Sequence, residues 1–345
     1  FRPETFYPSY GMAEATVFIS GGNAAALPIM PVVNKKLIAE RALELVPEDS
    51  PLATRIVACG SAFEPHDVRV VDPATLRERA EGEVGEIWFS GPSVSPGYWE
   101  LPELSRETFG QKIVGAPDNG HAYLRTGDLG LIWQGQVYVT GRIKDLIILR
   151  GRNYYPQDIE AAAMRAHHAV RGGHVAAFSQ PENGIEQLIV VAEIEREFFR
   201  SVNADEVASA IRQQVLLEYE VGVDQVVLLK PYKIHVTSSG KIARRQTRQM
   251  LNDGELDVIA RADTGTGQAE RAYTPPASAA EIMLCAIWHK VLNNPRISIH
   301  DNFFDLGGDS VAAIEISAAL QEHVSVMELE MSHLHEFPTI SQLAQ

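Results

Sequence analysis

Four short strings of the sequence hold acidic, basic and aromatic residues whose types could do chemistry. They are YGMAEAT (residues 10–16), YLRTGDLG (123–130), GRIKDLIILRGRNYYPQDIE (141–160) and TSSGKIARR (237–245). Glu14 and Asp128 offer carboxylate oxygens, and a hard oxygen ligand such as that of Glu14 suits magnesium. Arg142 and Lys241 offer positive charge, which displacement at phosphorus needs where negative charge develops. The four strings are therefore suited to chemistry on a phosphate group.

Each string alone also has a purely structural explanation. TGDLG suits a tight turn, because Gly and Asp are favoured there, and GKIARR could be the solvated basic end of a helix. The four strings in this order and spacing form a far more specific pattern than any one of them. Together they resemble the adenylate-forming superfamily, which includes acyl-CoA synthetases, luciferases and the adenylation domains of peptide synthetases.

The resemblance covers residues 1 to about 258 and implies that a carboxylic acid and ATP form an acyl-adenylate, whose acyl group then passes to a thiol. It implies that Tyr10 stacks on adenine, that Glu14 binds magnesium and that Asp128 holds the ribose hydroxyls. Arg142 is implied on the ribose and phosphate side, and Lys241 is implied as the catalytic residue at the attacking carboxylate and the α-phosphate. The residues that match ATP- or AMP-binding positions are Tyr10, Gly11, Met12, Glu14, Asp128 and Arg142.

Two positions depart from the family pattern. Ala13 stands where the family often has Thr, which removes one phosphate contact. The segment IHVTSSGK (234–241) replaces the usual Pro-Lys-Thr approach to the Ser-Gly-Lys run, although Lys241 itself is present. The altered approach weakens the match at this lysine.

Two features indicate the fatty acyl-AMP ligase branch of the superfamily. SYGMAEATVFISGG (9–22) and the string that begins at Gly141 resemble those ligases, with Lys144 as the hinge before a small mobile domain. The stretch between Tyr10 and Cys59 is longer than in acyl-CoA synthetases, and its excess lies around residues 34–55. Fatty acyl-AMP ligases carry an insertion there, which is thought to anchor the small domain and to disfavour CoA. An ordinary surface-loop insertion is the alternative explanation.

The string DNFFDLGGDSVAAIEI (301–316) resembles the carrier-protein motif in which a serine, here Ser310, receives 4′-phosphopantetheine. The ending PTISQLA (338–344) resembles the last carrier helix, whereas Val311 replaces the more usual Leu. A plain helix cap at Ser310 after a Gly-rich turn is the structural alternative. The resemblance implies a phosphopantetheinyl transferase as a partner.

Periodicity and turn residues predict the elements that must position these residues. Strands are expected at 67–72, 85–91, 137–142, 146–151, 174–179 and 187–195, and helices at 156–170, 202–219, 280–292 and 309–323. The helix at 202–219 is expected to begin at a cap on Asn203 or Asp205. The expected apolar faces of the last two helices contain Ile282, Ala286, Trp288 or His289, Leu292, Val311, Ile314 and Ala318. The pair His167–His168 is expected on a helix, where neighbours do not share a face, so a metal site there is not expected.

The expected fold is multidomain. Residues 1–143 are expected to form the mixed α/β end of a large adenylating core, and residues 144–258 a small mobile α+β domain. Residues 259–276 lack apolar periodicity and are expected to be a linker. Residues 277–345 are expected to form an all-α four-helix carrier domain. The core's Gly/Ser/Thr-rich phosphate loop is expected in a part that precedes residue 1, so the fragment alone is expected to be inactive.

Composition excludes several classes of protein. The net charge is −15, whereas a general nucleic-acid binder would be basic. No apolar run approaches the roughly 20 residues that a membrane helix needs. Two distant cysteines form no metal or disulfide pattern, which favours a cytoplasmic setting. Residues 272–345 hold nine acidic residues against Lys290 and Arg296, a surface suited to docking basic partner enzymes.

The expected function is activation of a fatty acid by ATP and magnesium, followed by acyl transfer to phosphopantetheine on Ser310. The product would be a starter unit for a downstream lipopeptide or polyketide synthase module. Two alternatives stay open: an amino-acid adenylation module with its peptidyl carrier, and a non-catalytic carrier or docking fragment. The string RGRNYYPQDIE (150–160) disfavours the first, and the retained Glu14, Asp128, Arg142 and Lys241 disfavour the second.

Overall fold

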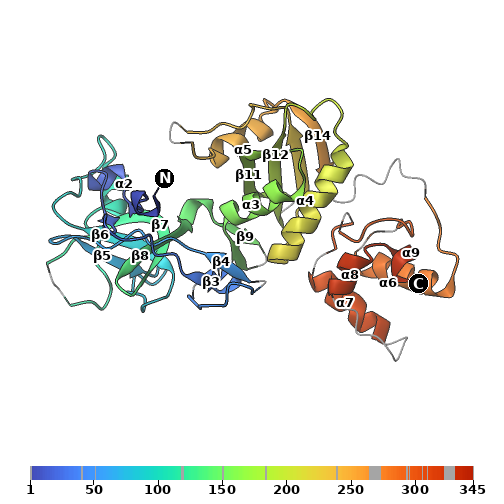
Figure 1. Cartoon of the computed structure of the whole chain (residues 1–345), viewed down its shortest axis with the longest axis horizontal. Helices are drawn as coiled ribbons and strands as arrows, with labels where there is room; N and C mark the ends of the chain where they lie inside the picture. The colour runs from blue at the N-terminus through green and yellow to red at the C-terminus, as the bar shows by residue number, and fades with distance from the viewer. Residues whose placement is uncertain are drawn as a thin grey trace. The chain divides into compact units, whose positions relative to one another are not determined.

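The computed structural model of the chain divides into two compact units, residues 1–146 and residues 147–345 (Figure 1). The structure describes residues 2–39, 42–50, 52–117, 120–149, 151–182, 185–237, 240–263, 273–292, 294, 296–304, 306–308, 310–321 and 331–344. The units divide between Leu146 and Ile147, two residues after Lys144, the expected hinge.

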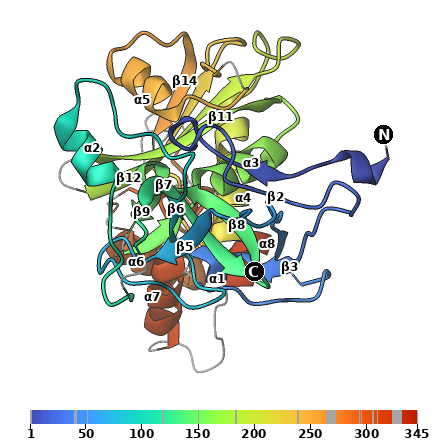
Figure 2. The same ribbon diagram turned by 90° about the vertical axis from the view of Figure 1, so that its left-hand side faces the viewer.

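The centre of the first unit is a four-stranded antiparallel sheet in sequential order (Figure 2). Its strands are β5 (Asp67–Val71), β6 (Gly85–Ser90), β7 (Leu124–Trp133) and β8 (Gln136–Arg142), which confirms the three strands expected here. Gln134 and Gly135 join β7 to β8, and both have positive φ, the backbone that favours tight two-residue hairpins. The turn sets the pairing as far as Gly130 opposite Val139, and a β-bulge between Leu129 and Gly130 then shifts the register by one residue, so that Asp128 on β7 lies opposite Arg142 on β8.

Shorter elements surround this sheet. They are β1 (Ser9–Tyr10), β2 (Ser20–Gly21), β3 (Val32–Asn34), β4 (Ala53–Arg55), α1 (Lys35–Ala39), α2 (Pro102–Thr108) and the 3₁₀ turns η1 (Pro3–Thr5), η2 (Ala13–Ala15) and η3 (Ile143–Asp145). Strands β3 and β4 pair antiparallel, so residues 34–55 return to their own starting point. The expected insertion therefore contains ordered secondary structure, and its effect on CoA remains a prediction.

The second unit contains a mixed sheet with helices on both faces. The strand order is β11 (Val170–Glu182), β12 (Ile185–Ile194), β13 (Gln225–Leu229), β14 (Val258–Asp263), and only the β12–β13 pair is parallel. One face packs on α3 (Pro156–Ala166) and α4 (Ala204–Tyr219), and the other face packs on α5 (Arg244–Asn252). The hairpin of β9 (Ile147–Leu149) and β10 (Arg152–Tyr154) precedes α3. The expected strands 146–151, 174–179 and 187–195 are confirmed, and Asn203 is the cap of α4.

Two expectations about this unit are wrong. Strand β14 reaches Asp263 and pairs with β13, so the expected linker 259–276 begins inside the sheet. Its sequence, IARAD, has no alternating apolar pattern that would predict a strand. The strand forms because it pairs with the buried strand β13. Helix α3 ends at Ala166, and His167 follows in extended backbone, so His167–His168 is not helical. Residues 264–272 of the expected linker lie outside the described residues.

A buried carboxylate stabilises the α5 face of the sheet. Glu193 on β12 is fully buried and pairs with Arg171 at 2.5 Å. Burial by itself raises the pKa of Glu193, but the backbone N–H groups of residues 232–234 and the Arg171 guanidinium lower it by more, so the pKa lies below its usual 4.5. The ionised Glu193 therefore contributes its full stabilisation to the folded state at a pH above the usual 4.5.

We expect the second unit to lose stability as the pH falls through the lowered pKa of Glu193. Protonation removes the charge that the surrounding donors stabilise, and the unfolded state takes up this proton at a higher pH. Urea unfolding between pH 3 and pH 7 of wild type and Glu193→Gln measures the effect. A variant whose stability falls as steeply as that of wild type in the acid range would contradict it.

The last part of the second unit is helical in its described residues. It contains α6 (Ala279–Val291), α7 (Ser310–Gln321), α8 (Met331–Glu336) and α9 (Ile340–Leu343). Capping boxes begin α6 at Ser278 and α9 at Thr339. In the core, the Trp288 ring packs edge-on against Phe303 at a centroid distance of 5.2 Å. Residues 322–330 lie outside the described residues, so the complete four-helix arrangement stays a prediction.

The expected apolar face of α6 is right at Trp288, which is fully buried, and at Leu292, which packs on the core, but the rest of it and the expected face of α7 are wrong. Ile282 is 54% exposed, and Val311 and Ile314 are 52% and 69% exposed. The buried side chains are Leu284, Cys285, Ile287 and Trp288 in α6, and Ala313, Ile316 and Ser317 in α7. Both helices are apolar on nearly all sides, so periodicity offers several equivalent stripes and tertiary packing decides between them.

No helix in the part of the chain that the structure describes is long and apolar enough to span a membrane.

Candidate functional site

Asp128 is the centre of a polar cluster in the first unit. Its side chain is buried, and Oδ2 accepts a hydrogen bond of 2.8 Å from the Tyr10 hydroxyl. Its Oδ1 accepts from Arg142 Nε at 2.6 Å, while most of the Arg142 side chain is exposed. The structure therefore brings three residues that the sequence singles out into direct contact.

The cluster fixes the charge state of its members. Burial raises the pKa of the Tyr10 phenol, and the neighbouring Asp128 carboxylate raises it further, so Tyr10 is a neutral donor. The hydrogen bond to Asp128 raises the pKa of Arg142, which keeps its guanidinium charged. The Tyr10 ring is buried in the core with Ile87 and Phe89, so a stacked adenine would meet only its small exposed part.

Two residues that the sequence did not single out position the backbone of β7 around Asp128. The buried Glu86 accepts from the Gly127 N–H at 3.1 Å and from Arg125 Nε at 3.0 Å. Thr126 Oγ1 donates to a backbone carbonyl on β6 and accepts from the Asp128 N–H. The sequence offered one indication of Glu86: it is an acid inside an expected strand whose other residues are apolar or small. Buried carboxylates are rare unless they are paired, so such an acid is expected to have a partner.

The turn that carries Glu14 is tightly constrained. A Cβ on Gly11 would lie 1.5 Å from the Val17 carbonyl oxygen, so only glycine fits there. Met12 accepts backbone hydrogen bonds from Ala15 and Val17, which closes η2 around Glu14. Thr16 and Val17 both have positive φ, of 54° and 78°, which is costly for β-branched residues. Such strain concentrates at functional sites, where the surrounding structure holds it.

Glu14 and Tyr98 form a contact that the sequence did not reveal. The Tyr98 hydroxyl donates to Glu14 Oε1 at 2.9 Å, and burial together with this bond raises the pKa of Tyr98 to about 12. The described residues contain no cluster of three or more His, Cys, Asp or Glu side chains that could hold a metal ion. A single oriented carboxylate fits magnesium that arrives with a nucleotide, because magnesium is usually held by one or two carboxylates plus phosphate oxygens.

The two predicted lysines, Lys144 and Lys241, lie on short turns. Lys144 is exposed on η3, two residues after Arg142 at the end of β8. Lys241, in the second unit, is exposed on a turn in which its backbone N–H donates to Thr237 Oγ1 at 3.1 Å. The roles expected for both lysines remain predictions.

Ser310 is the first residue of α7, and its side chain lies outside the described set. The backbone before it makes a tight turn, in which Gly308 N–H donates to the Phe303 carbonyl at 2.9 Å. A Cβ on Gly308 would lie 2.4 Å from the Phe303 ring, so this glycine lets the turn pack on the core. The fold thus places Ser310 at a helix start, as expected for either a modified serine or a cap.

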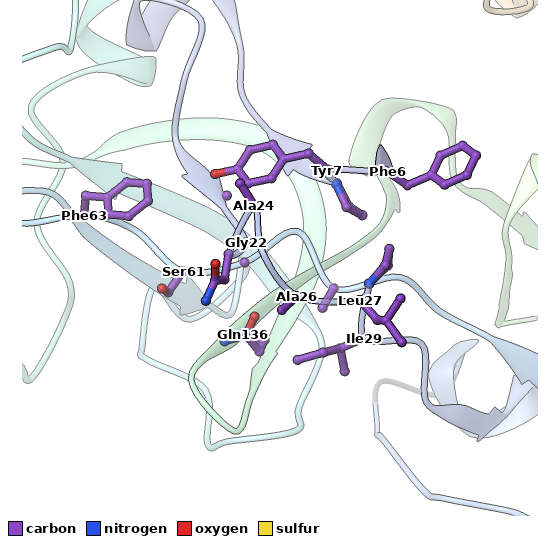
Figure 3. Close-up of a pocket in the computed structure, with 16 residues that line it drawn as sticks. Phe6, Tyr7, Gly22, Ala24, Ala26, Leu27, Ile29, Ser61, Phe63 and Gln136 are labelled. Carbon is purple, nitrogen blue, oxygen red and sulfur yellow. The ribbon is translucent and has the colours of Figure 1, made fainter. Parts of the chain in front are cut away.

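A separate cavity of about 590 Å³ lies in the first unit (Figure 3). Leu27 and Ile29 lie together at one end and Phe63 at the other, with the polar groups of Tyr7, Ser61 and Gln136 between them. None of Tyr10, Glu14, Asp128 and Arg142 lines it. The cavity and the Asp128 cluster are therefore different features.

Comparison with known protein families gives three matches in chain order. Residues 1–99 match the AMP-binding enzyme family, and residues 144–261 match the AMP domain of the Disco-interacting protein 2-like family. Residues 284–345 match the phosphopantetheine attachment site family.

Among curated relatives, a medium-chain-fatty-acid–[acyl-carrier-protein] ligase, JamA of Moorena producens, is 38% identical over 259 residues, which are 74% of this chain and 43% of JamA. The long-chain-fatty-acid–AMP ligase FadD32 of Mycolicibacterium smegmatis is 36% identical over 284 residues, 74% of this chain and 45% of that protein. The chain spans less than half the length of these relatives.

Two solved structures share the fold. The McyG A-PCP structure, complexed with phenylalanyl-adenylate, has a TM-score of 0.73 and covers all of this chain and 49% of its own, at 24% identity. A fatty acyl-adenylate ligase structure, from studies of the E. coli and L. pneumophila enzymes, has a TM-score of 0.61 at 31% identity and covers 74% of this chain and 43% of its own. The chain therefore contains an AMP-binding domain segment (residues 1–99), a Disco-interacting protein 2-like AMP domain (144–261) and a phosphopantetheine attachment domain (284–345), and its curated relatives include fatty-acid ligases.

Proposed function

We propose that the protein containing this chain activates a fatty acid as an acyl-adenylate and loads it onto its own carrier domain. The observation that carries the proposal is the presence, in one chain, of the Asp128 cluster and a phosphopantetheine attachment domain. The choice of a fatty acid is supported by relatives that are fatty-acid ligases. The loaded acyl group would serve a downstream lipopeptide or polyketide synthase module as a starter unit.

The proposed chemistry has two steps. A carboxylate oxygen of the fatty acid attacks the α-phosphorus of magnesium-bound ATP, the bond to the β-phosphate oxygen breaks, and pyrophosphate leaves. Phosphopantetheine on Ser310 would supply the thiol acceptor for the second step. The acyl carbon would form a bond to its sulfur, the thiol proton would pass to solvent, and AMP would leave with the electrons of the C–O bond.

We assign the roles of the chain's residues in these steps as follows. Asp128 and Arg142 hold the ribose and phosphate side of the nucleotide, and Tyr10, with the turn at Gly11 and Met12, borders the adenine. Glu14 binds the magnesium. Lys241 neutralises charge at the α-phosphate, and the small domain turns about Lys144 between the steps. The two free cysteines support a reducing, cytoplasmic setting.

Intact-protein mass spectrometry on the full-length protein tests the proposal. The protein is treated with a phosphopantetheinyl transferase and CoA, and then with ATP, magnesium and a mixture of fatty acids and amino acids. A phosphopantetheine increment followed by a fatty-acyl increment is expected. An aminoacyl increment would move the protein to the peptide-synthetase class, and loading without any acylation would leave only a carrier function.

We expect Tyr98→Phe to weaken the use of magnesium-ATP about 10-fold. The variant keeps the ring but removes the hydroxyl that orients Glu14, and a hydrogen bond to a charged group contributes about 1.5–3 kcal/mol. ATP–pyrophosphate exchange at varied magnesium measures the change, which should shrink at high magnesium. Tyr273→Phe is a matched control, because Tyr273 is exposed and lies in the other unit. Equal effects of both variants would contradict the role of Tyr98.

A further inference from the structure

Lys241 lies on a short hairpin whose described arms are residues 235–237 and 240–243, paired antiparallel at Val236 and Ile242. The Ala243 N–H donates to the His235 carbonyl at 2.9 Å, and the Thr237 N–H donates to the Lys241 carbonyl at 2.8 Å. The side chains of His235, Val236 and Thr237 are exposed, as is that of Lys241. The placement of Lys241 therefore depends on what holds the two ends of the hairpin.

Glu193 holds the end that precedes the hairpin. Its carboxylate accepts from the backbone N–H groups of Tyr232 at 2.8 Å, Lys233 at 2.5 Å and Ile234 at 2.6 Å. Tyr232 has a φ of 66°, and Arg171, the ion-pair partner of Glu193, lies over its ring at 4.1 Å. Three donors on one fully buried acid thus keep this segment in a strained backbone conformation.

Glu160 holds the end that follows the hairpin. Arg244, the residue after the hairpin, donates from Nε to Glu160 Oε1 at 2.6 Å and from Nη2 to Oε2 at 2.7 Å. Glu160 is buried on α3 and also accepts from the Ala177 N–H on the edge strand β11 at 3.0 Å. This bidentate pair fixes direction as well as distance, because guanidinium and carboxylate are both planar.

We propose that Glu193 and Glu160 are positioning residues for Lys241, an inference that rests on the proposed function. Each acid is buried and lies in the rigid sheet-and-helix layer, whereas the lysine between them is exposed. A misplacement of about 1 Å in a reacting group can cost roughly 100-fold in rate. Neither acid touches the substrate, and both act through the backbone that carries Lys241.

Two variants test the two ends. Glu193→Gln keeps the shape of the side chain but removes the charge, and it places an amide where three N–H donors need an acceptor. Arg244→Lys keeps the positive charge and loses the bidentate geometry, and it is the milder change if the first variant folds poorly. We expect each to lower ATP–pyrophosphate exchange about 10- to 100-fold.

The readout separates positioning from loss of structure. Transfer of the acyl group from supplied acyl-adenylate to the holo carrier domain does not need Lys241 at the α-phosphate, so it should stay near the wild-type rate. In a protein that already carries Lys241→Ala, neither variant should lower ATP–pyrophosphate exchange any further. A parallel loss of both half-reactions, or additive effects with Lys241→Ala, would overturn the proposal.

Asp257→Asn is the matched control. Asp257 pairs at 2.6 Å with the Lys233 side chain of the same segment, but both side chains are about half exposed, so this ion pair is worth little. We expect exchange activity and transfer of this control to match wild type. An Asp257→Asn effect as large as that of Glu193→Gln would show a general sensitivity of the segment and overturn the specific role.

Hydrogen exchange of the amides in residues 235–243 separates this proposal from the proposed function. These amides are expected to exchange hydrogen faster in Glu193→Gln than in Asp257→Asn, whether or not the enzyme is active. Unchanged protection in Glu193→Gln and Arg244→Lys would overturn the inference. A wild-type protein that activates no acid would instead refute the proposed function, while the amide result would still decide whether the two acids hold the hairpin.

Discussion

Ser310→Ala is expected to abolish phosphopantetheine loading completely, because the alanine lacks the oxygen that forms the phosphodiester. The serine lies at the first position of α7, in the segment that matches the phosphopantetheine attachment family. Incubation with a phosphopantetheinyl transferase and CoA, followed by intact-protein mass spectrometry, measures the effect. Wild type should gain one phosphopantetheine per chain and the variant none.

The control for this prediction is a second serine on the same helix. Ser317 is buried on α7, two helical turns after Ser310, so Ser317→Ala should be loaded like wild type. Removing a serine at a helix start costs about 1 kcal/mol when it acts as a cap, so circular dichroism must show that Ser310→Ala is folded. A phosphopantetheine increment on the folded Ser310→Ala protein would move the attachment to another residue.

The sequence predicted elements well where one local rule governs the chain. The strands at 67–72, 85–91 and 137–142 have buried β-branched and aromatic residues between turns, and all three occur. Asn203, one of the two expected caps, begins α4 because its side-chain oxygen accepts from the backbone N–H of Glu206, which has no acceptor inside the first turn of the helix. Strand β14 and the buried faces of α6 and α7 could not be predicted, because pairing and packing with distant residues determine them.

The same division applies to the candidate site. Tyr10, Asp128 and Arg142 were found from their motifs, and the structure brings them together through the β7–β8 register. The motif did not reveal Tyr98 or Glu86, which contact Glu14 and Gly127 from segments far away in the chain. Such partners depend on tertiary contacts, so spacing along a single sequence cannot identify them. A buried acid in an otherwise apolar strand, as at Glu86, is the one sequence signal that could have found a partner.

Lys241→Ala is expected to lower acyl-adenylate formation by about 100-fold or more, the usual cost of removing a group that stabilises transition-state charge. The side chain is exposed, so the variant should fold with wild-type stability, and the loss should be catalytic. If the lysine acts only on developing charge, kcat and kcat/KM should fall equally, with little change in the KM for ATP. ATP–pyrophosphate exchange by the full-length protein measures this effect.

Lys233→Ala provides the comparison that makes the result specific. Lys233 is an exposed lysine on the segment that leads to the Lys241 hairpin, and its side chain contacts only the exposed Asp257 among the described ion pairs. Both variants therefore remove one positive charge from the second unit, but only Lys241→Ala removes the charge that we assign to the α-phosphate. Near-wild-type exchange in Lys233→Ala, with a 100-fold loss in Lys241→Ala, assigns the effect to Lys241. Equal losses in the two variants would indicate a general electrostatic attraction of ATP. Removing a group that stabilises transition-state charge costs about 100-fold or more, so a loss below about 3-fold in Lys241→Ala would show that this residue does not act in the chemistry.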